Sequence, residues 1–100
     1  MNKKEVINRI NDNEDRLNRI LSVIKDLEES LNNFDNIYED INKLNKYYGS
    51  NNWFNDKDMV EKKKIENIKC GVLSEDTVWN MNEDINDLLL KMKDVLSKIN

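Results

Sequence analysis

The chain of 100 residues contains no histidine, no proline and no alanine, one cysteine and two glycines. Without histidine, Ser-His-Asp and Cys-His catalytic arrangements and zinc sites of the Cys/His type are excluded. Two glycines are too few for a Gly-rich phosphate loop. We therefore expect no enzyme, no cofactor and no metal. Because the lone Cys70 has no partner for an internal disulfide, we expect the chain in the cytoplasm.

Long apolar runs and a strong charge of one sign are also missing. The longest apolar run is Leu88-Leu89-Leu90, far short of a membrane span. The net charge is −4, and no segment is basic enough to neutralise a row of phosphates. We therefore expect no membrane contact and no direct binding of nucleic acid.

Charged residues make up 36% of the chain, a share typical of solvated helices when the apolar residues are periodic. Disorder is the competing interpretation, and the regular apolar spacing argues against it. Two series repeat every seven residues, first Ile10, Leu17, Ile24, Leu31 and Tyr38, and second Val6, Ile20, Leu27, Phe34, Ile41 and Tyr48, with Asn13 interrupting the second.

These series predict a helix over about residues 3–48, either continuous or broken near Asn11–Asn13 or Asn32–Asn33. The apolar stripe is narrow before residue 20 and wider after it. A narrow stripe suits one partner helix and a wide one suits two. Asn13 and Asn45 lie on the stripe, where a buried asparagine would fix the register and a solvated one would do nothing.

A second regular series runs from Val78 to Ile99 and predicts a C-terminal helix over about residues 75–98. Ser74 is a good N-cap, and Glu75 and Asp76 suit the first turn.

The connection, residues 49–73, is predicted to hold short helices, one from Trp53 to about Lys57 and a second over 58–69. Gly49 suits the end of the first helix because it adopts positive φ without strain, and Ser50 suits a turn or cap. Gly71 permits another tight turn.

Four of the seven aromatic residues, Tyr47, Tyr48, Trp53 and Phe54, stand where the first helical pattern stops. We expect them to cover the end of a helical hairpin, since each buries a large area at low conformational cost. A partner-binding patch is the alternative, and the two roles are compatible.

The blocks YYGSNNW (47–53) and GVLSED (71–76) resemble the signature of a family of short bacterial proteins, the domain of unknown function 4298. The resemblance covers essentially the whole chain, although only these two blocks are specific. It implies an α-helical protein and no established activity, substrate or cofactor. The chain departs from the family pattern near Ile65, where proline is usual, and at Cys70, where a basic residue is usual.

Other residues have both an ordinary and a functional interpretation. Asp56 and Asp58 would bind a divalent cation or act as acid and base if they joined Glu75 and Asp76, but those two residues are also what a helix start prefers. Cys70 is either a small buried apolar residue or a reactive thiol near a helix start.

Trp79 and Leu90 fall off the apolar stripe of the last helix, eleven residues apart. Two large apolar side chains on an outward face indicate a second contact surface. The alternative is that a helix from the connection covers Trp79.

We therefore predict a single all-α domain over residues 1–100. It is an antiparallel helical hairpin or three-helix bundle with a long N-terminal helix, short connecting helices and a C-terminal helix. Because the first helix is longer than the last, residues 3–20 are expected to pair in an antiparallel homodimer.

We expect a non-catalytic module that binds a protein partner through the aromatic residues and the outer face of the last helix. One alternative is a small acidic phage or mobile-element inhibitor of a host nucleic-acid enzyme, and another is a carboxylate metal-binding protein. The candidate residues are Tyr47, Tyr48, Gly49, Ser50, Trp53, Asp56, Gly71, Val72, Leu73, Ser74, Glu75, Asp76, Trp79 and Leu90.

Overall fold

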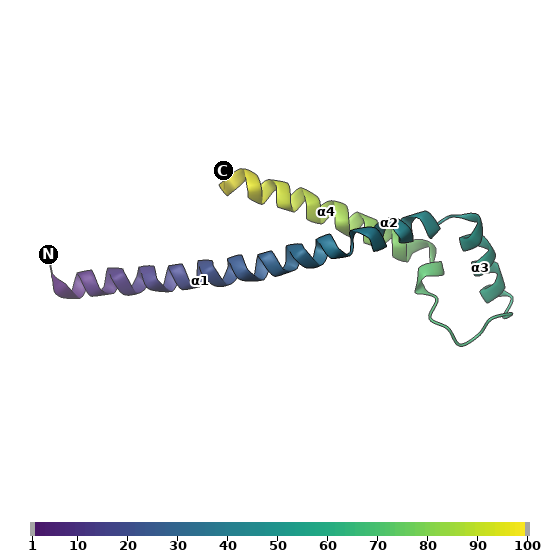
Figure 1. The fold of residues 1–100 in the computed structure, drawn as a ribbon, viewed down its shortest axis with the longest axis horizontal. Helices are drawn as coiled ribbons and strands as arrows, with labels where there is room; N and C mark the ends of the chain where they lie inside the picture. Colours follow the sequence, from purple (N-terminus) through teal and green to yellow (C-terminus); the bar gives the residue numbers. More distant parts are fainter. Residues whose placement is uncertain (1, 100) are drawn as a thin grey trace. The chain divides into compact units, whose positions relative to one another are not determined.

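The computed structural model describes residues 2–99, which are mostly helical and include no β-strand (Figure 1). Its elements are α1 (Lys3–Asn36), α2 (Tyr38–Tyr47), α3 (Asn51–Glu61), the 3-10 helix η1 (Gly71–Leu73) and α4 (Glu75–Ile99). The chain divides into two compact units, Met1–Asp40 and Ile41–Asn100. The predicted all-α class is confirmed. Within residues 2–99, no helix combines the length and apolar character that crossing a membrane requires.

The first unit is dominated by α1, a helix of 34 residues. It begins at Asn2, whose Oδ1 accepts a hydrogen bond from the backbone N–H of Lys4 at 2.8 Å, as an N-cap does. No residue of α1 is buried, although its apolar residues keep their seven-residue repeat. The stripe that would normally build a core is therefore in contact with solvent.

The helical pattern is interrupted at Ile37. Its N–H bonds to the carbonyl of Phe34, three residues back, at 3.3 Å, and its backbone angles are φ −93° and ψ 2°. Poor helix formers surround this point, including Asp35 and Asn36. The predicted extent of the first helix, 3–48, agrees closely with the combined span of α1 and α2, but a continuous helix was the wrong expectation. The expected alternative breaks, at Asn11–Asn13 and Asn32–Asn33, are also wrong because those residues are helical.

The second unit starts its turn at Gly49, whose φ of 76° confirms the predicted left-handed residue after a helix end. Ser50 then caps α3, because its Oγ accepts from the N–H of Trp53 at 3.2 Å. Ser74 caps α4 in the same way, accepting from the N–H of Asp76 at 3.3 Å. These local predictions hold because capping depends on a few adjacent residues.

The rest of the connection differs from the prediction. Residues 58–61 continue α3, and residues 62–70 form turns and bends instead of the second short helix expected over 58–69. Lys63 and Asn67 have positive φ, 57° and 64°, which no right-handed helix contains. The apolar residues Ile65 and Ile68 are exposed, so no burial stabilises a helix there.

In the second unit, the end of α2 and the start of α4 run antiparallel (Figure 1). Tyr48, just after α2, bonds to Glu75, while Asn45, one turn earlier, bonds to Asn82, two turns later. The Asn45 and Asn82 amides exchange two hydrogen bonds of 2.9 and 3.2 Å. The antiparallel order predicted for the hairpin is therefore present at this end.

Burial in α4 decreases toward its C-terminus. Val78 is 2% exposed, Met81 and Ile85 are half-buried, and Leu88, Met92 and Ile99 are exposed. The buried apolar residues of the described chain are Trp53, Leu73 and Val78. The core therefore lies where α3 and η1 approach the start of α4.

Candidate functional site: the aromatic tip and the last helix

The aromatic tip, defined as Tyr47, Tyr48, Trp53 and Phe54, is organised around the indole of Trp53. This side chain is 3% exposed. Its ring stacks on Tyr48 with centroids 5.3 Å apart, and Phe54 meets it edge-on at 5.0 Å. The indole Nε1–H donates to the carbonyl of Val72 at 2.9 Å. The indole is thus both packed and hydrogen-bonded, which defines one position for the ring.

Tyr47 bonds to α3 within the connection, and Tyr48 bonds to the start of α4. Tyr47 donates its hydroxyl proton to Oδ2 of Asp56, and Tyr48 donates to the backbone carbonyl of Glu75, each at 2.6 Å. The hydrogen bond to Asp56, together with desolvation and the negative charge of that carboxylate, raises the pKa of Tyr47 above its ordinary value of 10.0. The hydroxyl of Tyr47 is therefore held as a proton donor.

Lys57 was not among the residues singled out from the sequence. Its Nζ lies 3.1 Å from Oε1 of Glu75 and 5.1 Å from the centroid of the Trp53 ring, an ion pair and a cation–π contact. The sequence feature that could have identified Lys57 is its position four residues after Trp53, which places the two side chains on one face of a helix. Asn82, which pairs with Asn45, was also missed, because its partner depends on the pairing of two distant segments.

The two signature blocks meet in this site. From the first block come Tyr48 and Trp53, and from the second come their acceptors, the carbonyls of Glu75 and Val72. Leu73, at the end of η1, is 8% exposed and adds to the same core. The signature residues thus have contacts that fold the tip. A role in partner binding would depend on which of these side chains are exposed.

The four aromatic side chains differ in the fraction of their surface that is exposed. Tyr47 and Tyr48 are half-buried, while Phe54 is 60% exposed. The expectation that all four cover the hairpin end is therefore wrong for Phe54, whose position next to Trp53 in α3 turns its ring toward solvent. Phe54 is therefore the most exposed side chain of the aromatic tip.

The proposed carboxylate cluster does not assemble. Asp56 accepts from Tyr47, Glu75 pairs with Lys57, and Asp58 pairs with Lys62 at 3.0 Å on its own helix. Within residues 2–99, no three side chains of the His, Cys, Asp and Glu types are placed to hold a metal ion. The carboxylates of the tip therefore act as hydrogen-bond and ion-pair partners inside the protein.

The outer face of α4, defined as Trp79 and Leu90, remains uncovered. Trp79 is 59% exposed and Leu90 is 64% exposed. Trp79 follows Val78 directly, so adjacent side chains of one helix point to the core and to solvent. The alternative that the connection covers Trp79 is wrong, because α3 and η1 approach the other face.

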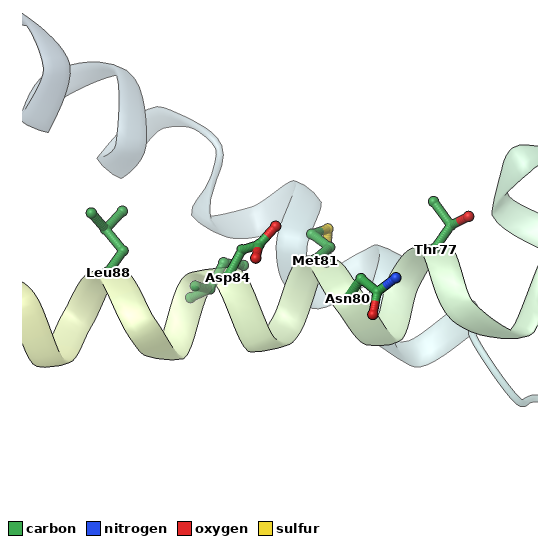
Figure 2. Close-up of a pocket in the computed structure, with 6 residues that line it drawn as sticks. Thr77, Asn80, Met81, Asp84 and Leu88 are labelled. Atoms are coloured by element: carbon green, nitrogen blue, oxygen red, sulfur yellow. The ribbon is translucent and has the colours of Figure 1, made fainter.

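The surface of the second unit is hollowed in places. One hollow, of about 440 Å³, follows the side of α4 that carries Met81 and Leu88, and Figure 2 shows Thr77, Asn80, Met81, Asp84 and Leu88 in succession along that helix. Another, of about 300 Å³, lies between α3 and η1 and is lined in part by the half-buried Cys70. The first is lined by residues of α4 alone, so it is an open hollow along one helix rather than an enclosed cavity.

Fold and site together define a class, an all-α protein in which aromatic side chains and backbone carbonyls join two helices at one end. Within that class, the chain belongs to the family described as domain of unknown function (DUF4298), which it matches over residues 10–95. Both signature blocks lie inside the matched range, as the resemblance implied. No curated protein and no solved structure matches the chain.

Proposed function

We propose that this protein is a non-catalytic interaction module of the bacterial cytoplasm. It binds a protein partner through the outer face of α4 and through Phe54 of the aromatic tip. The observation that best supports this proposal is the exposure of two large apolar side chains on α4. Trp79 is 59% exposed and Leu90 is 64% exposed, on a helix anchored at its start by the buried Val78. Eleven residues correspond to about 16 Å along a helix, so a single partner helix or groove spans both side chains.

The acidic residues of α4 indicate the charge that a partner surface would carry. Residues 75–87 carry five acidic side chains and no basic one. Glu83 and Asp87 lie between Trp79 and Leu90 in the sequence, and both are exposed. A complementary partner therefore offers an apolar pocket for the indole with lysine or arginine beside it. Such a charge pattern speeds association more than it strengthens the complex.

Affinity capture from the native host tests this proposal. Wild-type protein is compared with Trp79→Ala and Leu90→Ala, and we expect each variant to recover at least about tenfold less partner, as truncation of a central interface residue does. The matched control is Leu96→Ala, because Leu96 is the same residue type on the same helix and is 61% exposed.

Near-ultraviolet circular dichroism of each variant establishes that the tip is still folded before the capture is interpreted. Equal recovery by wild type, Trp79→Ala and Leu90→Ala would contradict the proposal. So would an equal loss with Leu96→Ala, since binding would then not depend on the outer face.

An acidic inhibitor of a nucleic-acid enzyme is the second candidate, and the absence of basic residues from 75–87 favours it. A protein of this kind would occupy the basic DNA channel of the enzyme. We expect it to compete with DNA for the captured partner and to lose that competition when Glu83 and Asp87 are both changed to lysine.

A carboxylate metal protein is the third candidate from the sequence, and two of its acidic residues at the tip, Asp56 and Glu75, already have protein partners. Calcium or magnesium would raise the melting temperature if a site formed from Asp56, Glu75 and Asp76. An unchanged melting temperature at millimolar metal would remove this candidate.

A further inference from the structure

The apolar stripe of α1 is the largest feature that the proposed function does not use. The residues at the first seven-residue position, Ile10, Leu17, Ile24 and Leu31, are 44–55% exposed, and those at the second, Ile20 and Leu27, are 55–56% exposed. Exposed apolar side chains scattered singly are ordinary, but a continuous stripe over four turns or more marks a contact surface.

The stripe has no covering element within its own unit. The unit Met1–Asp40 consists almost entirely of α1, and no residue of α1 is buried. A lone helix offers nothing that could pack on its own apolar face, so the stripe is open to a second molecule.

We propose that the first part of α1, residues 3–20, forms a parallel, in-register, two-stranded coiled coil with the same segment of a second copy of this chain. The inference is independent of the partner-binding surface on α4. It keeps the homodimer expected from the sequence and replaces its antiparallel order.

The charges beside the stripe select the parallel order. One flank carries Arg9 and Arg16 followed by Val23 and Ser30, and the other carries Glu14, Glu28 and Asp35 with Ile7 and Leu21 between them. Parallel coiled coils bring a residue of the first flank against the residue five further along on the partner's other flank. Arg9 then meets Glu14 of the second copy, twice in the symmetric dimer, and no like charges meet.

An antiparallel pair has no such attraction. In that order each flank faces its own copy, so acidic residues meet only acidic or apolar residues, and arginines meet only arginines or uncharged residues. The same charge pattern therefore favours one order and disfavours the other.

Asn13 selects the register. It occupies the second position of the repeat, where the other members are apolar. Its amide has partners within the chain, since Nδ2 donates to the backbone carbonyl of Arg9 at 2.8 Å and Oδ1 accepts from Nη1 of Arg16 at 3.3 Å. Parallel in-register pairing places Asn13 opposite Asn13 of the second copy, so polar groups face polar groups. Antiparallel pairing would set it against an apolar residue of the first position, such as Ile10 or Leu17, which offers no hydrogen bond.

The width of the stripe fixes the number of strands. Before residue 20 the stripe is essentially confined to the two seam positions plus Ile7, which is the width that one neighbouring helix covers. A second copy, and not a bundle of several, therefore fits this segment.

Disulfide cross-linking of the full chain tests the order and register. In a Cys70→Ser background, we expect Val6→Cys and Ile20→Cys each to form a covalent dimer under mild oxidation, because seam residues at the second position face their own copies. The matched control is Ser22→Cys, which points away from the seam and should not cross-link. An antiparallel pair brings at most one position opposite itself, so failure of Val6→Cys or Ile20→Cys to cross-link would overturn the proposal.

Sedimentation equilibrium supplies the second measurement. We expect wild-type protein to be dimeric at micromolar concentration, Leu17→Asp to be monomeric, and Ser22→Asp to stay dimeric. Near-ultraviolet circular dichroism from Trp53 should be the same in all three, which separates loss of the dimer from loss of the fold. A wild-type monomer at high micromolar concentration, or a trimer, would overturn the proposal.

Charge exchange tests the pairing itself. Arg9→Glu should weaken the dimer about tenfold, since two favourable pairs become repulsive. The double variant Arg9→Glu with Glu14→Arg should restore it, whereas Arg19→Glu, away from the flanks, should have little effect. An absence of rescue would exclude the parallel register.

Discussion

In α1, Ile10 and Ile24 belong to a seven-residue repeat and are each 55% exposed, whereas Val78, which begins the same kind of repeat in α4, is 2% exposed. The two helices have similar sequence patterns and opposite degrees of burial. The difference comes from what lies beside them. Trp53 from α3 and Leu73 from η1 join the core around Val78, whereas no residue of α1 is buried.

The comparison shows that a periodic stripe and a core are different things. The repeat places apolar residues on one face, but burial requires that another element approach that face. At the tip, the hydrogen bonds from Tyr48 and Trp53 to the carbonyls of Glu75 and Val72 hold such an element in place. Variants at the tip should therefore alter stability far more than variants in α1.

The largest effect is expected for Trp53→Ala. It removes the most important side chain of a small core and leaves a cavity, which costs about 3–5 kcal/mol of the free energy of unfolding. A domain of this size has little stability beyond that, so we expect the second unit to lose its cooperative thermal transition, measured by near-ultraviolet circular dichroism.

Ile24→Ala is the matched change in α1. At a dilution where the chain is monomeric, it should alter the melting of the tip by less than about 0.5 kcal/mol, as exposed substitutions do. An effect of Ile24→Ala as large as that of Trp53→Ala would abolish the distinction between the two regions.

The next effect concerns the turn. Gly49→Ala should destabilise the second unit by about 1–2 kcal/mol, because its φ of 76° strains any residue with a Cβ. Gly71→Ala is the control, since Gly71 has no positive φ and a Cβ there would meet no atom within 4 Å. Chemical denaturation of both variants tests this, and equal losses of stability would show that φ is not the cause.

Tyr47→Phe should cost about 1 kcal/mol at pH 7, the typical worth of one hydrogen bond, here the bond to Asp56. The pKa of Tyr47 is raised in the folded protein, so its contribution is fully present below the unfolded value of 10.0 and is lost as the pH rises through the folded pKa. Wild type should therefore lose stability above pH 10 while the variant does not, and their melting temperatures should converge. Parallel melting curves up to pH 12 would contradict this.

The smallest effect is expected for Lys57→Met. The ion pair with Glu75 is largely exposed on the Glu75 side, so the loss should stay below about 1 kcal/mol, and salt should reduce it. Thermal melting at low and high salt measures the loss of stability and its dependence on salt. A loss above that of Gly49→Ala would mean that the contact with the Trp53 ring contributes more than the ion pair.

Sequence reasoning predicted well where structure depends on neighbouring residues. The helical class, the turn at Gly49 and the caps at Ser50 and Ser74 follow from φ preferences and side-chain hydrogen bonds over three or four residues. The prediction of a second short helix over 58–69 was wrong, although four apolar residues lie in that segment, namely Met59, Val60, Ile65 and Ile68. Two of these residues stay exposed, so the spacing had no burial to stabilise it.

Other features could not be predicted from local pattern. Trp53 and Phe54 are adjacent and similarly apolar, yet one is 3% and the other 60% exposed. The pairing of Asp56 with Tyr47, and of Asn45 with Asn82, joins residues 9 and 37 positions apart. Such contacts depend on the direction in which α3 leaves the turn.

The amino-acid sequence by itself determined that the chain is helical, where α1 and α4 begin, and that each long helix has one apolar face, since propensity, capping and periodicity act within a few residues. Only the tertiary structure decided that Trp53 enters the core, that Asn45 pairs with Asn82, and that Asp56 and Glu75 bond to different partners. Those outcomes depend on side chains and carbonyls that meet only after the chain has turned back on itself, and no local rule specifies that approach.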